Sequence, residues 1–171
     1  GFFRRDVHTL MDIERCPIAA PEVNDALTKL RVGRVRVGHY TLRAQSNLRV
    51  FTQTNDKVAQ ALADLISGIL PGEAKLLIDA FCGAGFFTKR FANRFQQVVG
   101  IDWDRFAIEA AQRGAGSTES YIAGDVATEL PALLDQNNLT ETAVIVDPPA
   151  TGLTKETRRA LLDFPPHTVI Y

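Results

Sequence analysis

The chain has 171 residues, of which 46% are apolar and 23% charged, with 19 Lys and Arg against 20 Asp and Glu. This length suits one domain with or without an appendage, and the apolar fraction excludes a disordered or low-complexity chain. No apolar run reaches the roughly 18 residues of a membrane helix, and the N-terminus does not resemble a signal peptide. Two cysteines, Cys16 and Cys82, cannot form a disulfide framework, which favours a reducing compartment and a cytoplasmic protein.

Charge is unevenly distributed along the chain. The first 50 residues hold nine Lys and Arg against five Asp and Glu, whereas the rest holds ten against fifteen. Between Asp25 and Asp56, six basic residues occur without a carboxylate. Charge segregated in this way favours a polyanionic partner such as nucleic acid, although a solvated strand face is the alternative. No membrane or DNA partner is expected, and a monomer is expected.

The first 52 residues are predicted to form a strand-rich α+β segment. After Pro21, apolar residues recur at helical spacing up to Leu30, which predicts one amphipathic helix. The other predicted elements of this segment are strands over residues 1–5, 7–13, 40–43 and 48–52.

Two arginines of this segment are expected to lie side by side. From Val32 to Val37, the residues alternate with the period of two of a half-buried strand. This alternation places Arg34 and Arg36 on one face, where they can bind phosphates without reading sequence. Together with Arg43, they are the predicted nucleic-acid-binding residues.

Residues 53–171 are predicted to form a second domain in which helices and strands alternate. Its first helix is capped by Asn55 or Asp56 and ends before Pro71-Gly72. Six apolar residues of this helix are assigned to one face: Val58, Ala61, Leu62, Leu65, Ile66 and Ile69.

Five short apolar runs follow that helix and are predicted to be strands. They cover residues 76–78, 98–101, 121–123, 143–146 and 168–171, with helices expected over 86–95, 104–112, 130–134 and 156–162. Repeated β-α-β units predict an α/β fold with a doubly wound parallel sheet. Such sheets bind ligands outside the carboxyl ends of their strands.

Glycines and carboxylates occupy the predicted carboxyl ends of these strands. Gly83 and Gly85 permit a tight turn and close approach of a ligand, but Thr88 stands where a dinucleotide fingerprint needs its third glycine. Three carboxylates follow later strands: Asp102, Asp125 and Asp147. Each alone is explained as a helix or turn cap, whereas all of them together favour a cofactor that contains a nucleoside.

These stretches resemble the S-adenosylmethionine-dependent RNA uracil-5 methyltransferases, which make 5-methyluridine in ribosomal or transfer RNA. The resemblance rests on Asp79-Ala-Phe-Cys-Gly-Ala-Gly-Phe-Phe87, Gly100-Ile-Asp102, Gly124-Asp125 and Asp147-Pro-Pro-Ala-Thr-Gly-Leu153. Gly1-Phe-Phe-Arg-Arg5, Glu14-Arg-Cys-Pro-Ile18 and Phe51-Thr-Gln-Thr-Asn55 also fit. The resemblance therefore covers nearly the whole chain and implies the class I methyltransferase fold, incomplete at its C-terminal end.

The resemblance also implies the S-adenosylmethionine-binding residues, with S-adenosylhomocysteine as the product. They are Gln53, Phe81, Gly83, Gly85, Asp102, Asp125 and Asp147. By this resemblance, the glycines shape the loop around the methionine part. Asp102 binds the ribose hydroxyls, Asp125 binds the adenine edge, and Asp147 stands near the methionine end and the target base.

The chain departs from the family pattern at several places. Phe86 stands where the family usually has Asn, and Ala150 stands where it usually has Arg. The stretch between Cys16 and Gln53 is shorter than expected for the family, which indicates a reduced RNA-facing segment. Cys16 aligns with the last of four iron–sulfur ligands in some members, but one cysteine cannot hold a cluster. No metal site is expected.

The family reaction needs a cysteine thiolate that adds to carbon 6 of uracil and a base that removes the proton from carbon 5. By the resemblance, both groups belong after Tyr171, so no catalytic residue is expected within the chain. Cys82 is interpreted as a small buried loop residue. We therefore expect a chain truncated at both ends that binds S-adenosylmethionine weakly or not at all and does not methylate uracil by itself.

Two other functions remain as alternatives. The first is a non-catalytic RNA-binding module that keeps a methyltransferase fold and the basic segment. The second is a nicotinamide-dependent oxidoreductase, against which the missing third glycine and the Asp147-Pro-Pro149 segment count.

Overall fold

The computed structural model describes residues 2–3, 10–11, 13–17, 19, 21–32 and 56–171. The chain divides into two compact units, residues 1–48 with 52–60 and residues 49–51 with 61–171. The predicted strands at 40–43 and 48–52 lie outside the described residues, as do Arg34, Arg36, Arg43 and Gln53.

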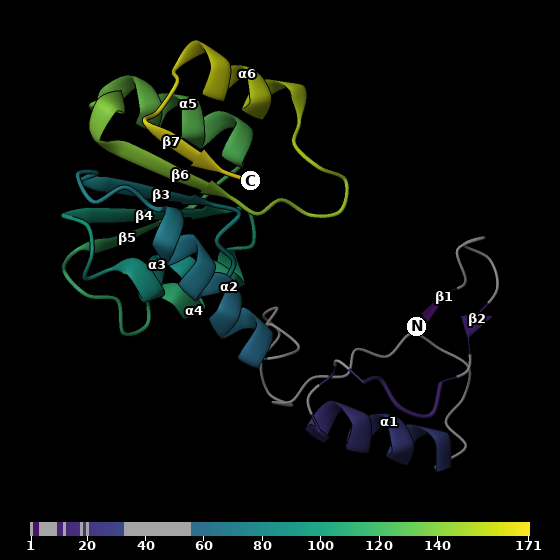
Figure 1. Ribbon diagram of the computed structural model, residues 1–171. Helices are drawn as coiled ribbons and strands as arrows, with labels where there is room; N and C mark the ends of the chain where they lie inside the picture. The colour runs from purple at the N-terminus through teal and green to yellow at the C-terminus, as the bar shows by residue number, and fades with distance from the viewer. Residues whose placement is uncertain (1, 4–9, 12, 18, 20, 33–55) are drawn as a thin grey trace. The chain divides into compact units, whose positions relative to one another are not determined.

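The N-terminal unit contains a short antiparallel pair of strands and one helix (Figure 1). Strands β1 (Phe2–Phe3) and β2 (Leu10–Met11) fall within the two predicted N-terminal strands, and α1 (Pro21–Val32) confirms the predicted helix. The buried side chain of Asn24 joins this helix to the preceding turn. Its Oδ1 accepts from the Cys16 amide at 2.7 Å, and its Nδ2 donates to the Cys16 carbonyl at 3.0 Å.

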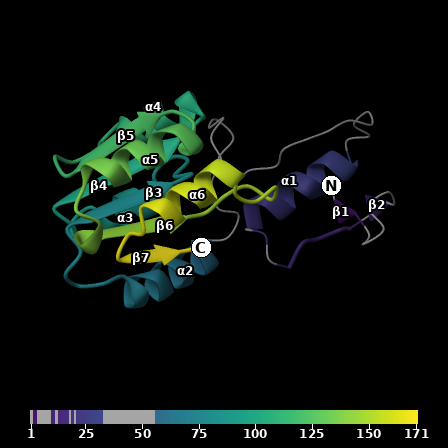
Figure 2. The ribbon, with the colours of Figure 1, turned by 90° about the horizontal axis from the view of Figure 1, so that it is seen from above.

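The second unit, called the sheet unit below, is built around five parallel strands in the order β5-β4-β3-β6-β7. The strands are β3 (Leu76–Ala80), β4 (Gln97–Asp102), β5 (Glu119–Ala123), β6 (Thr142–Val146) and β7 (Thr168–Ile170). Figure 2 shows them in this succession, with β7 at one edge. This order confirms the predicted doubly wound sheet.

Helices cover both faces of this sheet. They are α2 (Asp56–Ile69), α3 (Phe86–Phe91), α4 (Arg105–Gln112), α5 (Val126–Gln136) and α6 (Lys155–Asp163), and a 3-10 turn spans Leu139–Glu141. Residues of α5 and α6 pack with Ile78 and Val144 on one face, whereas residues of α2 and α3 pack with Leu77 and Ile145 on the other. In the described part of the chain, each helix is too short or too polar to cross a bilayer.

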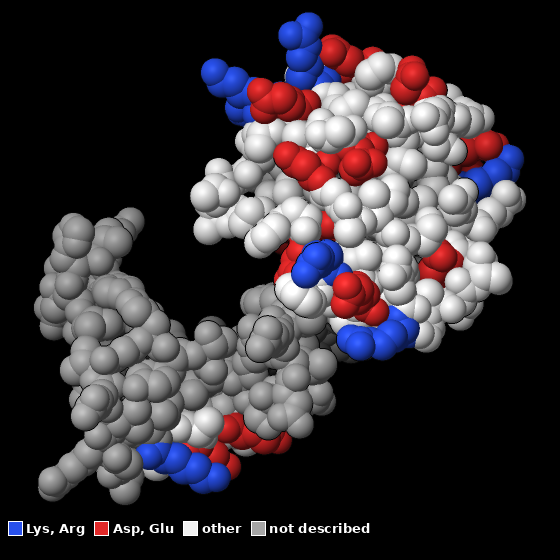
Figure 3. Space-filling model, turned by 180° about the vertical axis from the view of Figure 1, so that it is seen from behind, with Lys and Arg blue, Asp and Glu red and all other residues white. Residues whose placement is uncertain are grey.

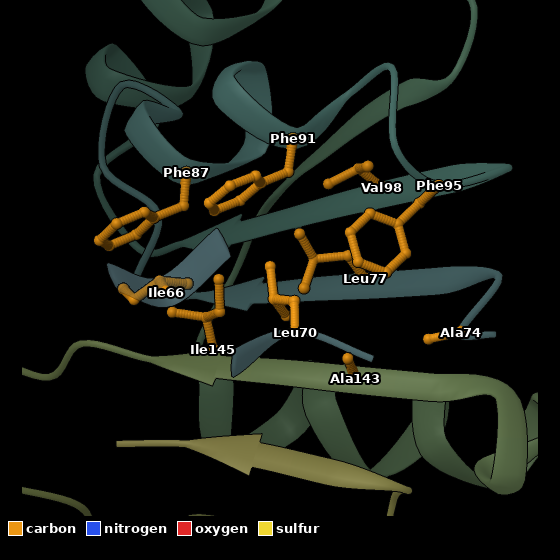
Figure 4. Packing of buried hydrophobic residues seen from close by; sticks show 10 residues of the cluster. All are labelled: Ile66, Leu70, Ala74, Leu77, Phe87, Phe91, Phe95, Val98, Ala143 and Ile145. Atoms are coloured by element: carbon orange, nitrogen blue, oxygen red, sulfur yellow. The ribbon is translucent and has the colours of Figure 1, made fainter. Parts of the chain in front are cut away.

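Three phenylalanines dominate the core beneath α3 (Figure 4). Phe87 and Phe91 stack with ring centroids 6.3 Å apart and planes inclined by 2°. Helix α3 ends at Phe91, so the prediction that it continues to Phe95 is wrong. Phe95 is nevertheless buried in the same cluster, because the turn after the helix directs it back onto the sheet unit.

The predicted buried face of α2 is wrong in most positions. Of the six residues assigned to it, Ile66 is buried, whereas Leu65 and Ile69 are 62% and 54% exposed. The buried residues of this helix are Ala59, Ala63 and Ile66, and Leu70 is buried just past its end. Apolar residues occur on both sides of this helix, so their periodicity alone does not identify the side that the sheet covers.

Candidate cofactor site

The carboxyl ends of β3 and β6 lie side by side at the point where the strand order reverses. From β3, the chain builds outward through β4 and β5 and then returns to the other side of β3 to form β6. The amide of Asp147 donates to the carbonyl of Ala80 at 3.3 Å, which joins the two ends. Parallel α/β sheets bind ligands at such a switch point.

A tight loop leaves β3 at this point. Phe81, Gly83 and Gly85 have φ angles of 68°, 54° and 81°, so three of five successive residues are left-handed. Phe81 is the non-glycine residue among them, and this conformation is strained for a side chain with a Cβ. Nothing lies within 4 Å of the place where a Cβ of Gly83 would stand. The loop therefore leaves open space against its backbone.

Asp102 ties the end of β4 to this loop. Its Oδ2 accepts from the Gly83 amide at 2.8 Å, and its Oδ1 accepts from the Asp104 amide at 2.8 Å. A carboxylate has about four acceptor positions, so the two bonds leave capacity for a ligand with hydroxyl donors. The position and the spare acceptors of Asp102 fit a ribose.

Asp79 lies beneath the same loop, inside β3. Its side chain is fully buried, and Oδ2 accepts from the Thr88 amide at 2.9 Å and from the Thr88 hydroxyl at 2.7 Å. Among the described residues, Oδ1 has no hydrogen-bond partner. Burial raises the pKa of Asp79 to about 7, although the Thr88 bonds oppose this effect. A buried carboxylate with one unpaired oxygen fits a site for a positively charged ligand group.

Asp79 is not among the binding residues predicted from the sequence, although it directly follows an apolar run. The signal that could identify it is a carboxylate next to Ile78 and before Ala80, in a strand that is otherwise apolar on both faces. Such a residue is rare in a buried strand without a partner or a function.

Two further carboxylates stand at the ends of neighbouring strands. Asp125 is exposed and caps α5, because its side chain accepts from the Ala127 amide at 2.9 Å. Asp147 is exposed after β6, and no hydrogen bond from the described residues reaches its carboxylate. The cap interpretation therefore holds for Asp125, which still has an oxygen that can accept from a ligand.

Cys82 is packed inside the loop. It is 7% exposed, and burial raises the pKa of its thiol well above the usual range. The thiol is therefore protonated and inaccessible, which confirms its interpretation as a packing residue. Phe86, where the family usually has Asn, is 38% exposed and meets Phe87 edge to face. Ala150 is exposed in the turn after Asp147.

The parallel sheet with its switch point, the glycine loop and the strand-end carboxylates define a class I S-adenosylmethionine-dependent methyltransferase fold. The cofactor of this class is S-adenosylmethionine. Residues 74–164 match the family described as RNA cap guanine-N2 methyltransferase. The chain belongs to this family of RNA methyltransferases.

Individual relatives agree with this class. An uncharacterized RNA methyltransferase of Leptospira interrogans is 31% identical over 163 residues, which cover 87% of this chain and 40% of the relative. The tRNA (uracil(54)-C(5))-methyltransferase of Schizosaccharomyces pombe is 24% identical over an alignment that covers all of this chain and 41% of the relative. The chain thus spans about two fifths of the length of these curated relatives.

A solved structure shares the fold. The tRNA (uracil-54, C5)-methyltransferase of Pyrococcus abyssi, in complex with S-adenosyl-L-homocysteine, superposes with a TM-score of 0.57 and 27% identity. The match covers 71% of this chain and 29% of that protein.

Proposed function

We propose that the sheet unit is the cofactor-binding part of an enzyme that transfers a methyl group from S-adenosylmethionine to carbon 5 of a uridine in transfer or ribosomal RNA. The observation that carries this proposal is the bond between Asp102 and the Gly83 amide, which places a carboxylate with spare acceptors beside an open glycine loop. The S. pombe and P. abyssi proteins named for uracil 54 of tRNA support the choice of base.

Each rim residue then has a distinct task. Asp102 accepts from the ribose hydroxyls, and the free oxygen of Asp125 accepts from the adenine edge. Gly83 and Gly85 admit the methionine part, which Phe81 and Gln53 also contact. When bound, the cofactor supplies an electrophilic methyl group on a positively charged sulfur. Asp147 stands beside the place where the target base enters.

Carbon 5 of uracil needs activation by a thiolate, which the described residues do not supply. Cys82 is buried and protonated, and Cys16 is buried too, with 9% of its surface exposed. We therefore assign the nucleophile and the base to residues outside this chain, and we expect that these 171 residues alone do not methylate uracil.

RNA binding is assigned to the basic N-terminal segment, through Arg34, Arg36 and Arg43. On the face of the sheet unit shown in Figure 3, acidic and basic side chains are interspersed and large areas carry neither. This face therefore offers no continuous basic surface for a phosphate backbone.

A second candidate is methylation of the exocyclic amine of guanine, and the family match favours it. An amine carries its own nucleophilic lone pair, so this reaction needs an acceptor for its proton rather than a thiolate. The exposed carboxylate of Asp147 can act as that acceptor.

Nucleoside analysis of RNA incubated with this chain distinguishes the candidates. N2-methylguanosine would favour the second, and 5-methyluridine would contradict the assignment of the nucleophile outside the chain.

Titration with S-adenosylhomocysteine tests the cofactor site. NMR is the readout, because it also detects weak binding. Asp102→Ala is expected to weaken binding roughly a hundredfold, because it removes two hydrogen bonds to a charged acceptor. Asp135→Ala, which removes an exposed carboxylate of α5, serves as the control and is expected to bind like the wild type. Equal affinity of Asp102→Ala and wild type would overturn the cofactor site.

If Asp102→Ala changed nothing and Arg34→Ala with Arg36→Ala abolished RNA binding, a non-catalytic RNA-binding module would be favoured.

A further inference from the structure

Three residues in adjacent strands form a row beneath the glycine loop. Asp79 in β3 pairs with Gly100 in β4, and Gly100 pairs with Tyr121 in β5. Residues paired in this way point to the same face of the sheet. A Cβ on Gly100 would lie 2.8 Å from Cys82 Sγ and 2.8 Å from Tyr121 Cδ1. The missing side chain of Gly100 therefore lets the tyrosine ring and the loop come together.

The Tyr121 ring lies against the backbone of Gly85. A Cβ on Gly85 would stand 2.8 Å from the phenol oxygen and 2.9 Å from Cε1. Gly85 is the left-handed residue at which the loop turns into α3. The phenol thus occupies the space directly beneath the point where the loop changes direction.

Glu119 holds the tyrosine in this orientation. The Tyr121 hydroxyl donates to Glu119 Oε2 at 2.6 Å, and Glu119 Oε1 accepts from the Gly116 amide at 2.8 Å. A buried hydroxyl needs such a partner, and the carboxylate is itself fixed to the turn before β5. The position of the ring is therefore set at both ends, by the strand and by the hydrogen bond.

The loop and the first turn of α3 are thus supported at one point each. Asp79 holds Thr88 through two hydrogen bonds, and Tyr121 meets Gly85 three residues earlier. We infer that Tyr121, oriented by Glu119, is a positioning residue that holds the glycine loop in its cofactor-binding shape. This inference rests on the proposed function, because it takes the loop to be the part that binds S-adenosylmethionine. It adds a residue of β5 that contacts the loop from beneath.

Two variants and one control test this inference in the full chain. Tyr121→Leu removes the ring from Gly85, whereas Tyr121→Phe keeps the ring and removes the bond to Glu119. Leu134→Val is the control, because Leu134 is a fully buried residue of α5, which covers the opposite face of the sheet. The first measurement is hydrogen exchange of the Gly85 amide, which donates to the Cys82 carbonyl at 2.9 Å. The second is the affinity for S-adenosylhomocysteine at a temperature where each variant is folded.

Tyr121→Leu is expected to speed exchange at Gly85 and to weaken S-adenosylhomocysteine binding on the order of tenfold, as for other residues that support a ligand-binding group without touching the ligand. Tyr121→Phe, which keeps the ring but loses the bond to Glu119, is expected to change both properties less than Tyr121→Leu, and Leu134→Val to change neither beyond its effect on global stability. Unchanged exchange in Tyr121→Leu, or an equal change in Leu134→Val, would overturn the inference. Absence of binding by the wild type would instead overturn the proposed cofactor site, while the exchange data still decide whether Tyr121 holds the loop.

Discussion

Asp79 is a carboxylate buried in the central strand, and its ionisation opposes folding. Burial raises its pKa to about 7 in the folded chain, against 3.8 for an ordinary aspartate. The folded chain therefore keeps this proton to higher pH than the unfolded chain. The stabilisation by the protonated carboxyl is complete below the ordinary pKa and is lost as the pH rises through 7.

Replacing Asp79 by Asn removes this titration. We expect the unfolding free energy of the wild type, relative to Asp79→Asn, to fall by up to about 1.4 kcal/mol per pH unit below pH 7 and to level off above it. Urea denaturation of both proteins from pH 5 to pH 8 measures the difference. A constant difference for Asp79→Asn would contradict the raised pKa.

Two glycines of the loop differ in what surrounds them, although both are left-handed. Gly83→Ala places a methyl group in open space. It should lower the unfolding free energy by about 1 kcal/mol, because a residue with a Cβ is strained in the left-handed conformation. Gly85→Ala has the same strain and also a clash with the Tyr121 ring. This clash should lower the unfolding free energy by about 1–3 kcal/mol more. Urea unfolding of the two variants side by side tests this order, and equal losses would show that Tyr121 yields to the added methyl group.

At the scale of the element, Asp125 combines a helix cap with a proposed contact to the cofactor. Asn caps a helix about as well as Asp, so Asp125→Asn should keep the stability of α5, whereas Asp125→Ala should lose about 1 kcal/mol. Thermal unfolding compares these stabilities, and titration with S-adenosylhomocysteine then reports the loss of the carboxylate in the Asn variant. A stability loss for Asn equal to that for Ala would contradict the cap.

The elements themselves were largely predictable from the sequence. Strands β3, β4 and β6 are short apolar runs because helices bury both of their faces, as is usual for a buried parallel strand. The wrong predictions for α2 concern which side of the helix faces the core. Leu65 and Ile66 are adjacent and equally apolar, yet Ile66 faces the core and Leu65 faces outward. Nothing local distinguishes them, because the choice depends on where the sheet lies.

At the scale of the whole molecule, the charge asymmetry leads to a prediction about RNA. RNA binding through the basic segment should weaken as the salt concentration rises. The plot of log K, where K is the RNA association constant, against log salt has a negative slope, and its steepness should decrease by roughly 0.7 for each phosphate that a variant no longer neutralises. Arg34→Ala with Arg36→Ala should reduce both affinity and slope. Lys75→Ala with Arg113→Ala removes as many charges from the sheet unit and serves as the control in a fluorescence titration. An equal loss in both double variants would contradict the assignment to the N-terminal segment.

The sequence by itself determined the class of fold, the glycine loop after β3 and the carboxylates at the strand ends, because each depends on residues that are near one another in the chain. The tertiary structure decided what lies beneath the loop. Asp79, Gly100 and Tyr121 are aligned by strand register, and Glu119 reaches the loop through a tyrosine that packs against Gly85. Register joins residues about twenty positions apart, so their contacts follow from the packing of the sheet rather than from any local pattern.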